Sequence, residues 1–445
     1  MGDSATPGSF SKRFDAVVDR LSLANHRVVV AFSGGLDSTL LLHALHRSAA
    51  IESLAAIHVE HGLHEDSADW SAHCASVAKS LDIDFVTCKL DLKLESGQSL
   101  ESIAREARYA ALVDAIGPGD IVLTAHHADD QLETVLMRLL RGTGVRGLTA
   151  IHAVRPFGAG RLARPLLDFT RAEIAAEATR LSLEWLEDPS NADTRFDRNF
   201  IRARILPALQ ERWPQGGVTA SRLARQMAEA ESVLGEVAAA DLAPAGGSER
   251  IPVDLLAALS EPRLNNALRH AVREQELPVP NAIQLAELRR ALVAREDSEV
   301  VVCWPGAEAR IYRHKLYLLS PAETGRSKTG RIDAGSAFAL ANGELHLVAA
   351  EAYGIPDRWA RDGLEVAFRA GGERFRPEGS QHHKRLKNWF QEAGIVPWMR
   401  GSVPLLFHGD ELVAVADICL ADSLPQGPGD GPFWRPVWRS RPSLQ

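Results

Sequence analysis

Two histidines and three carboxylates lie within eight residues of this chain, in the segment His126–Glu133. Asp129, Asp130 and Glu133 fall within one turn of an expected helix, so their carboxylates should converge. Such a group could bind Mg²⁺, accept a proton or hold a cationic amine. The plainer interpretation is that acidic residues here only compensate the dipole of a helix N-terminus. Two histidines and two aspartates are, however, more than capping requires.

A second cluster follows the apolar run Val28–Phe32 directly. It combines two glycines, three hydroxyl side chains and one carboxylate: Ser33, Gly34, Gly35, Leu36, Asp37, Ser38 and Thr39. Adjacent glycines let the backbone turn tightly and approach a ligand closely. The free N–H groups of the helix that should follow favour a phosphate. No lysine follows the glycines, so the segment is not a Walker P-loop. The pattern predicts a phosphate-binding turn, and the plain alternative is a strand-turn-helix with a capping serine.

Three histidines, His58, His61 and His64, stand at intervals of three after the next apolar run. This spacing could indicate a metal site, although one histidine should lie on the strand and the others beyond it, so a shared face is not assured. Together with the histidine and aspartates of 126–133, they would suit a metal-dependent phosphoesterase, which we keep as an alternative function.

Arginines lie at helical spacing in a further segment, where Glu101, Arg105 and Arg108 stand at i, i+4 and i+7. Alone, this pattern favours a solvent-exposed face held by ion pairs. Contact with a phosphate is the functional alternative for the two arginines.

Three more segments are locally basic, although the net charge of the whole chain is −8. We expect Arg195, Arg198 and Arg202 to share one helical face. The charge excludes a general nucleic-acid coat, whose footprint would be basic overall, but local patches could still bind RNA. The residues that could contact RNA are Arg141, Arg146, Arg195, Arg198, Arg202, Arg374, Lys384, Arg385, Lys387 and the interleaved aromatic Trp389.

The elements that must position these side chains alternate in the first ~145 residues, by the usual patterns of strand and helix. Strands are expected at Val28–Phe32, Leu54–Val59, Phe85–Leu90 and Ile121–Ala125, and helices at Ser38–His46, Ser67–Ser80, Ser99–Ala115 and Gln131–Leu140. Strands that are apolar on both faces and alternate with helices predict an α/β, doubly wound parallel sheet. Ligands of such sheets bind at the carboxyl ends of the strands, where the clusters fall.

The rest of the 445 residues should form two further domains. A bend at Trp213–Gly217 precedes a long helical pattern at 220–242, and short strands with turns begin near residue 332. We therefore expect a catalytic domain at 1–212, a mostly helical domain at 213–325 and a small α+β domain at 326–445. The four scattered cysteines form no CxxC pair and fit a reducing, cytoplasmic location. No apolar run reaches the ~20 residues of a membrane span, so no membrane partner is expected.

The segment 33–38 resembles the PP-loop of the N-type ATP pyrophosphatases, which cleave ATP between its α and β phosphates and adenylate a substrate. Within that superfamily the chain resembles the tRNA(Ile)-lysidine synthetases along nearly its whole length. The segments that carry this resemblance are 101–109, 126–134, 141–148, 188–202 and 371–400. Where the family has Asn and Arg after the second strand, this chain has Glu60 and His64, so the role of that arginine cannot be transferred.

The resemblance implies ATP and Mg²⁺ as cofactors. Ser33–Ser38 would hold the pyrophosphate, and Asp37 would bind Mg²⁺ or the leaving group. His126 would lie near the nucleotide, and either Arg105 or Arg108 would contact ATP phosphate or substrate. We take Asp37, Arg105 and His126 as catalytic on this basis.

The same resemblance implies two further substrates, a tRNA(Ile) with a CAU anticodon and free lysine. Asp130 and Glu133 would bind the ammonium groups of lysine, and Asp130 is a reasonable catalytic base for the attacking amine. The implied reaction adenylates C2 of the wobble cytidine and joins lysine to it, forming lysidine with release of AMP and diphosphate. Another PP-loop tRNA-modifying enzyme is the second alternative. The oligomeric state is left open, with a homodimer as one candidate.

Overall fold

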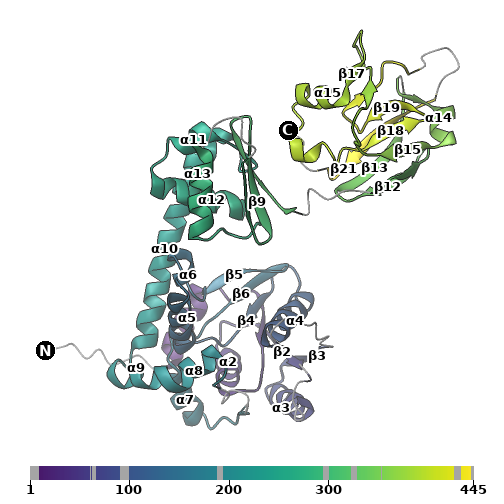
Figure 1. Cartoon of the computed structure of the whole chain (residues 1–445). Helices are drawn as coiled ribbons and strands as arrows, with labels where there is room; N and C mark the ends of the chain where they lie inside the picture. Colours follow the sequence, from purple (N-terminus) through teal and green to yellow (C-terminus); the bar gives the residue numbers. More distant parts are fainter. Residues whose placement is uncertain are drawn as a thin grey trace. The chain divides into compact units, whose positions relative to one another are not determined.

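The structure is a computed structural model of the chain that describes residues 10–60, 62, 67–90, 100–187, 194–293, 300–321, 328–351, 353–424 and 432–441. Contacts divide the chain into two compact units, Met1–Val233 and Leu234–Gln445. Figure 1 labels the helices and strands of both units, and each unit is described separately below.

A six-stranded sheet forms the centre of the first unit. Its strands are β1 (Arg27–Ala31), β2 (Ser53–Glu60), β3 (Asp84–Lys89), β4 (Ile121–Leu123), β5 (Val154–Phe157) and β6 (Gly160–Ala163). They stand in the order β3-β2-β1-β4-β6-β5, and all are parallel except the edge strand β5. The strand order reverses between β1 and β4, which is the kind of switch point at which open α/β sheets bind ligands.

Both faces of this sheet are buried, as the apolar runs predicted. In β1, Val28 and Val30 join one hydrophobic cluster with Leu41, whereas Val29 joins another with Leu112. Successive strand residues point to opposite faces, so a strand apolar on both faces requires cover on both. The doubly wound α/β fold expected from the sequence is confirmed.

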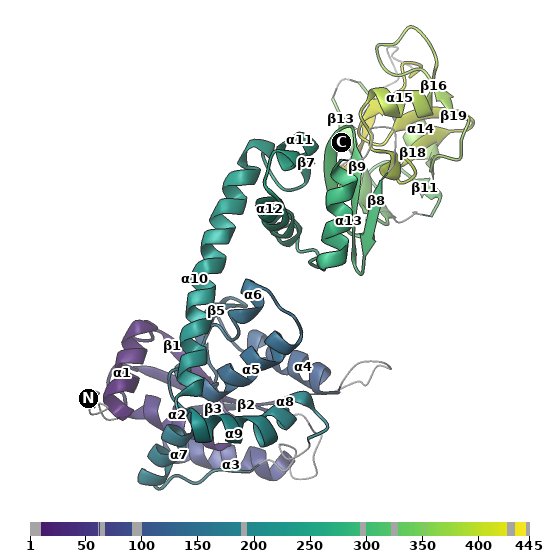
Figure 2. The same ribbon diagram turned by 60° about the vertical axis from the view of Figure 1, so that its left-hand side comes forward.

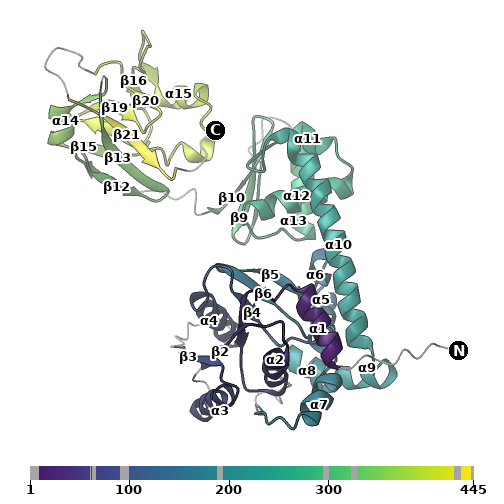
Figure 3. The same ribbon diagram turned by 180° about the vertical axis from the view of Figure 1, so that it is seen from behind.

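Helices cover the two faces of the sheet. The first unit contains α1 (Phe10–Arg20), α2 (Leu36–Arg47), α3 (Ser67–Ser80), α4 (Leu100–Asp114), α5 (Ala128–Leu140), α6 (Val145–Leu148) and α7 (Arg171–Arg180). Figure 3 shows α1 and α2 side by side on one face, where Phe14 and Leu41 share a core. The expected helices agree with these bounds to within a few residues at each end.

Further helical elements follow α7 in the chain, and the last of them packs against α5. They are α8 (Asp197–Phe200), a π-helical turn (Ile201–Ile205), α9 (Leu206–Arg212) and, after a non-helical break at residues 213–215, α10 (Gly216–Leu242). Figure 2 shows α10 as one long helix. Ala220 and Ala224 of α10 pack against Val135 of α5. A Cβ atom on Gly217 would lie 2.9 Å from the backbone of Ala128, so only glycine lets α10 begin so close to α5.

The second unit begins with helices packed on a four-stranded antiparallel sheet. Its helices are α11 (Val253–Ala257), α12 (Glu261–Glu274) and α13 (Ala282–Leu292), after a short 3₁₀ turn at Ala243–Ala245. The strands β7 (Arg250–Pro252), β8 (Val301–Trp304), β9 (Ala307–Tyr312) and β10 (Lys315–Leu319) stand in the order β7-β10-β9-β8. Leu268, Leu288 and Leu316 belong to the shared core.

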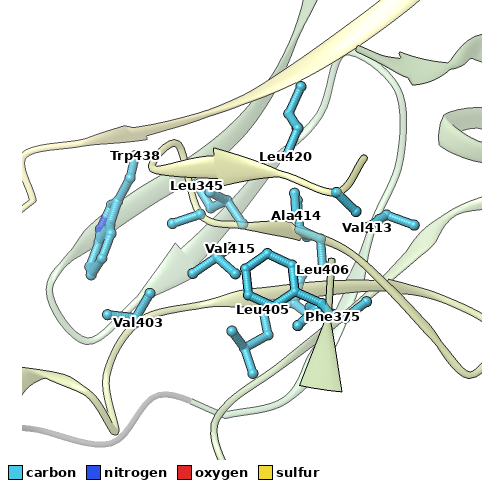
Figure 4. Close-up of a cluster of buried hydrophobic side chains, with 14 of the residues drawn as sticks. Leu345, Phe375, Val403, Leu405, Leu406, Val413, Ala414, Val415, Leu420 and Trp438 are labelled. Atoms are coloured by element: carbon cyan, nitrogen blue, oxygen red, sulfur yellow. The ribbon is translucent and has the colours of Figure 1, made fainter. Parts of the chain in front are cut away.

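The remainder of the second unit consists of two antiparallel sheets with short helices. One sheet has the order β11-β15-β18-β19-β20 and the other β12-β13-β21-β14, with a separate pair β16-β17. The strands are β11 (Gly330–Ile332), β12 (Ala337–Leu340), β13 (Gly343–Ala350), β14 (Ile355–Pro356), β15 (Leu364–Ala367), β16 (Arg374–Phe375), β17 (Lys384–Arg385), β18 (Leu405–His408), β19 (Glu411–Val415), β20 (Cys419–Leu420) and β21 (Phe433–Arg439). The helices are α14 (Asp357–Asp362), α15 (Leu386–Glu392) and a 3₁₀ turn at Pro397–Met399. Figure 4 shows side chains from both sheets, among them Leu345, Leu405 and Trp438, meeting in one core.

The order of an α/β sheet, a mostly helical part and a small α+β part agrees with the expected fold class. The contact division falls at Val233, inside α10, and separates two units. The two boundaries expected between the three domains, at 212/213 and 325/326, therefore stay predictions.

Candidate functional site

The polar clusters found in the sequence meet at one edge of the parallel sheet. The turn 33–35 follows β1, Glu60 ends β2, His126 lies just past β4, and Arg164 follows β6. Because the carboxyl ends of parallel strands share an edge, segments up to 130 residues apart in the sequence are brought together there.

The turn between β1 and α2 is held by its own side chains. Ser33 Oγ lies 3.0 Å from Ser38 Oγ, and the Ser38 hydroxyl donates to the carbonyl oxygen of Gly35 at 3.1 Å. Gly35 is the N-cap of α2, and no side chain caps this helix end. The N–H groups of a first helical turn have no intrahelical partner, and they attract phosphate groups. The predicted phosphate-binding turn therefore has the required backbone form.

Gly34 is required in this turn for two separate reasons. Its φ is +79°, in the left-handed region that side chains disfavour. A Cβ atom there would also lie 2.9 Å from Cys74 Sγ and 3.2 Å from Leu186 Cδ1. The backbone of the turn is further fixed by a hydrogen bond from the Leu186 N–H to the Gly34 carbonyl, at 2.9 Å. The two residues that hold Gly34 lie far from it in the sequence.

Asp37 stands on the first turn of α2 and faces the N-terminus of α5. Its Oδ2 lies 3.7 Å from His127 Nε2, and its buried Oδ1 has no hydrogen-bond partner among the described residues. Burial raises the pKa of Asp37, and His127 opposes this rise. A buried carboxylate oxygen without a partner fits a metal ligand, because Mg²⁺ is usually held by one or two carboxylates together with substrate phosphates.

The N-terminus of α5 is capped by residues of the acidic cluster. The His127 side chain accepts a hydrogen bond from the Asp129 N–H at 3.2 Å, and Asp130 Oδ2 accepts one from the His127 N–H at 3.0 Å. This is a reciprocal capping box. The capping interpretation is therefore correct for these atoms, and the remaining carboxylate oxygens make other contacts.

Asp130 and Glu133 are paired with two arginines that approach from α8 and the π-helical turn. Arg198 contacts Asp130 Oδ1 and Glu133 Oε2, each at 2.8 Å. Arg202 contacts Asp130 Oδ1 at 2.9 Å and Glu133 Oε1 at 2.6 Å. The Glu133 side chain is only 1% exposed, whereas both arginines are 29% exposed. The carboxylates predicted to bind lysine and the arginines predicted to bind tRNA thus form one four-residue ion cluster.

This cluster disfavours the role of general base that the sequence suggested for Asp130. Burial alone would raise the pKa of Asp130, but His127, His126 and Arg198 together lower it below its ordinary value. A carboxylate with a lowered pKa holds a proton weakly. Asp130 is ion-paired with Arg198 and Arg202 in this arrangement, and its role as a base stays a prediction.

Asp129 joins three separate segments of the first unit. Its Oδ1 accepts a hydrogen bond from Gln210 Nε2 of α9 at 2.7 Å, and its Oδ2 accepts one from the Arg171 N–H at 2.6 Å. The residue is 5% exposed. Asp129 therefore fixes α7 and α9 to the start of α5, and nothing in the sequence pattern indicated this role for Gln210.

His126 is neutral at physiological pH in this environment. Burial lowers the pKa of His126 to about 3, with Asp130 opposing and Arg164 and Arg198 adding to the shift. Its Nδ1 lies 2.8 Å from the hydroxyl of Thr124. A neutral imidazole can accept or donate a hydrogen bond, but it contributes no positive charge to the site.

Arg164 is a site residue that the sequence analysis missed. It follows β6 directly, is 6% exposed, and donates to the His152 carbonyl oxygen at 2.5 Å. The available signal was its place immediately after the short strand at 160–163, whose last two residues, Leu162 and Ala163, are apolar and buried. Arg105 is exposed on α4, and its guanidinium carbon lies 5.3 Å from the ring centroid of Tyr109. The side chain of Glu101, expected on the same helix face, lies outside the described residues.

Of the three histidines at intervals of three, only His58, on β2, lies among the described residues, so the alternative of a metal site there stays a prediction. His58 is buried, and its Nδ1 lies 2.9 Å from the Phe32 carbonyl oxygen. His61 and His64 lie outside the described part of the chain, and within that part no three His, Cys, Asp or Glu side chains converge as metal ligands. Glu60 forms a long ion pair with Lys89, at 3.7 Å.

The other arginines expected to bind RNA in the first unit lie on its surface. Arg141 is 66% exposed and pairs with Asp197 at 3.3 Å, and Arg146 is 64% exposed and lies 3.8 Å from Glu231. Arg195 is exposed too, but the expectation that it shares a helical face with Arg198 and Arg202 is wrong. Arg195 lies in the turn before α8, because the helix begins only at Asp197.

The basic stretch of the second unit is mixed in its exposure. Arg374, Arg385 and Lys387 are exposed, whereas Lys384 is half-buried and pairs with Glu392 at 2.5 Å. Trp389 is half-buried and packs edge-on against Phe375, with ring centroids 5.3 Å apart. The aromatic ring therefore belongs to the packing around the core, and the exposed charges lie beside it.

No helix in the described residues combines the length and apolarity of a membrane span.

Three family models match the chain: a PP-loop domain at residues 8–209, a TilS substrate binding domain at 252–317 and a TilS substrate C-terminal domain at 364–435. Each match falls inside one of the three expected domains.

Curated relatives match nearly the whole chain. The tRNA(Ile)-lysidine synthase of Alkalilimnicola ehrlichii is 40% identical over 90% of this chain and 91% of its own. That of Methylococcus capsulatus is 40% identical over 87% of this chain and 90% of its own, and that of Pseudomonas aeruginosa is 40% identical over 92% of both. These matches do not favour the metal-dependent phosphoesterase.

Proposed function

Since this chain belongs to the tRNA(Ile)-lysidine synthase family, we propose the following course for its reaction. The chain is an ATP-using enzyme that forms lysidine on tRNA(Ile). The C2 oxygen of the wobble cytidine in a CAU anticodon is first adenylated, with release of diphosphate. The side-chain amine of lysine then attacks C2 and displaces AMP. Adenylation is needed because that oxygen is otherwise a poor leaving group.

The observation that carries the proposal is the PP-loop turn beside the half-buried carboxylate of Asp37, which is 30% exposed. The start of α2 offers N–H groups to the phosphates of ATP, and the buried Oδ1 of Asp37 stands beside it without a hydrogen-bond partner among the described residues. We assign Asp37 as a ligand of Mg²⁺, which would neutralise charge on the phosphates when bound. Because Asp37 lies beside His127, the N-cap of α5, an ion bound to Asp37 would also be positioned next to the start of that helix.

The ion cluster on α5 and α8 supports the proposed binding of free lysine. It contains two carboxylates, Asp130 and Glu133, and two guanidiniums, Arg198 and Arg202, at distances of 2.6–3.0 Å. Lysine carries two ammonium groups and one carboxylate, so a cluster with both signs of charge offers partners to each. Arg198 and Arg202, which the sequence suggested as RNA contacts, are instead proposed to act in this cluster. The exposed arginines are then left to contact RNA.

The remaining proposals concern RNA, location and assembly. We propose that exposed Arg141, Arg146 and Arg195 contact tRNA from the first unit, and that the basic stretch from Arg374 to Lys387 does so from the second. A cytoplasmic location is proposed because the four cysteines are all free and scattered. A homodimer remains a proposal without a specific contact to support it.

The test is incorporation of radiolabelled lysine into unmodified CAU-anticodon tRNA(Ile), with and without ATP. Incorporation should require ATP and should be abolished in Asp37→Asn, which keeps the shape of the side chain but removes its charge. Asp114→Asn, at the exposed end of α4, is the matched control and should behave as the wild type. Turnover of ATP to AMP with another acceptor, but without lysine incorporation, would leave the PP-loop assignment standing and reject the lysidine reaction.

A further inference from the structure

Three arginines gather on the β6 side of the site. Only Arg105 among them was given a role from the sequence, as a contact for ATP phosphate or substrate. Arg164 follows β6, Arg155 lies on the neighbouring strand β5, and Arg105 projects from α4. The ring of Tyr109 links them, because the guanidinium carbons of Arg105 and Arg155 lie 5.3 and 5.4 Å from its centroid. The Tyr109 ring itself packs edge-on against Phe157, with centroids 5.8 Å apart.

The three arginines differ from Arg198 and Arg202 in their ion pairing. Among the described residues, no carboxylate lies within ion-pair distance of Arg105, Arg155 or Arg164. The contrast with Arg198 on α8 and Arg202 on the π-helical turn is direct, since each of those contacts two carboxylates. Like charges repel, so guanidiniums gathered in one place are costly unless an anion joins them.

Arg164 gives the second, independent observation. It is 6% exposed, and its buried Nε has no hydrogen-bond partner among the described residues. A buried donor without a partner costs free energy and calls for an explanation such as a missing ligand. Burial lowers the pKa of Arg164, and Arg155 and Arg105 add to this shift while Tyr109 opposes it.

We propose that Arg105, Arg155 and Arg164 form a binding site for a phosphate group of a bound substrate, beside His126. Guanidinium groups match phosphate oxygens in geometry and charge, and they are well suited to partly buried sites. Buried Arg164 supplies a fixed positive charge, and the more exposed Arg105 and Arg155 supply donors held in place by Tyr109.

The phosphate has two sources among the substrates of the proposed function, ATP and the RNA backbone. Adjacent strands lie about 4.8 Å apart, so the end of β6 stands about 10 Å from the end of β1, two strands away. A triphosphate at the turn 33–38 and a phosphate at Arg164 can therefore be different groups. This spacing favours a backbone phosphate next to the target nucleotide, and the experiment distinguishes the two sources.

The test measures equilibrium binding with the full chain. Mg-ATP binding is followed by calorimetry, and binding of a fluorescent CAU anticodon stem-loop RNA by anisotropy over a series of KCl concentrations. The variants are Arg155→Gln and Arg164→Gln. The matched control is Arg161→Gln, at the amino end of the same strand β6, where the arginine donates only to the Ser22 carbonyl oxygen at 2.7 Å.

The expected result is binding of one ligand weakened roughly ten-fold or more, the effect of losing one charged hydrogen bond. If the ligand is RNA, the slope of log K against log salt should also become shallower by about 0.7 to 0.9 per lost contact. If it is ATP, the calorimetric affinity falls and the salt slope for RNA stays unchanged. Arg155→Lys, which keeps the charge without the planar fork, should recover part of the lost affinity.

The proposal is overturned if Arg155→Gln binds both ligands as tightly as Arg161→Gln does. Arg155 is half-buried on an edge strand, so this variant decides the matter even where replacing buried Arg164 prevents folding. The choice of ATP and RNA as ligands rests on the proposed function, but the test measures their binding and not the reaction. Failure of lysidine formation in the wild type would therefore reject the proposed function without deciding the phosphate site.

Discussion

Replacing Glu133 by Gln should loosen the junction between α5 and α8 by about 3 kcal/mol. The Glu133 carboxylate is 1% exposed and accepts three hydrogen bonds from Arg198 and Arg202, at 2.8, 2.6 and 3.0 Å. Removing one partner from a buried ion pair typically costs about 3 to 5 kcal/mol. The lower end applies here because both arginines are 29% exposed and water can partly solvate them.

The assay is hydrogen–deuterium exchange of peptides from α5 and α8, because the chain has two units and need not unfold in one step. A loss of about 3 kcal/mol corresponds to exchange about 100-fold faster in the slowest amides of these peptides. Glu177→Gln is the control, since Glu177 pairs with Arg180, whose side chain is 64% exposed. That surface pair should contribute below about 1 kcal/mol.

Two results would refute the reasoning about this cluster. Unchanged exchange in Glu133→Gln would mean that the carboxylate does not hold α8 to α5. Additive effects of Glu133→Gln and Arg202→Met in a double-mutant cycle would mean that the two side chains are not coupled, whereas direct contact predicts a coupling of about 1 kcal/mol or more. A raised KM for lysine with unchanged exchange would assign Glu133 to the ligand alone.

Three further predictions follow from single residues. Gly34→Ala should abolish ATP-dependent lysidine formation, because the added Cβ atom would lie too close to Cys74 Sγ. Gly142→Ala is the control and should retain activity, since Gly142 has a similar φ of +73° but open space around its Cβ position. Equal loss of activity in both variants would show that backbone strain alone causes the loss. The pKa of His126 is about 3 in the folded chain and about 6.5 in the unfolded chain. Between these two pH values only the unfolded chain binds a proton at His126, so the free energy of unfolding should fall by about 1.4 kcal/mol for each pH unit from 6.5 down towards 3. His126→Gln should flatten this part of a melting-temperature profile, and an unaltered profile would contradict the assignment. Burial raises the pKa of Cys74 to about 12, so a thiol reagent at pH 8 should label exposed Cys303 and leave Cys74 unlabelled until the chain unfolds.

The sequence alone determined the architecture of the first unit. Runs such as Val28–Phe32 are apolar on both faces and alternate with helical patterns, and this local information is sufficient to predict a parallel sheet covered on both sides. It also placed the polar clusters at the carboxyl ends of the strands. The phosphate-binding turn Ser33–Ser38 could be predicted because the glycine, hydroxyl and carboxylate residues that it requires are consecutive in the sequence.

The partners of the clustered side chains could not be predicted in this way. Asp130 and Glu133 meet Arg198 and Arg202 across 65 to 72 residues of sequence, and Gln210 meets Asp129 across 81. A motif gives the residue types at one site but not which distant segment returns to it. Arg195 shows the same limit of local patterns. Its spacing from Arg198 and Arg202 predicted a shared helical face, but the helix begins only two residues after Arg195, at Asp197.

The sequence thus supplied the reacting groups, while the tertiary structure decided their charge state and their partners. Whether Asp130 is a base or a charge partner depends on how deeply it is buried and on which arginines reach it. Arg105, Arg155 and Arg164 come from α4, β5 and the end of β6, and only the packing of the sheet brings them together. Burial and proximity set pKa values and binding sites, and both are properties of the folded chain that no local pattern of residues contains.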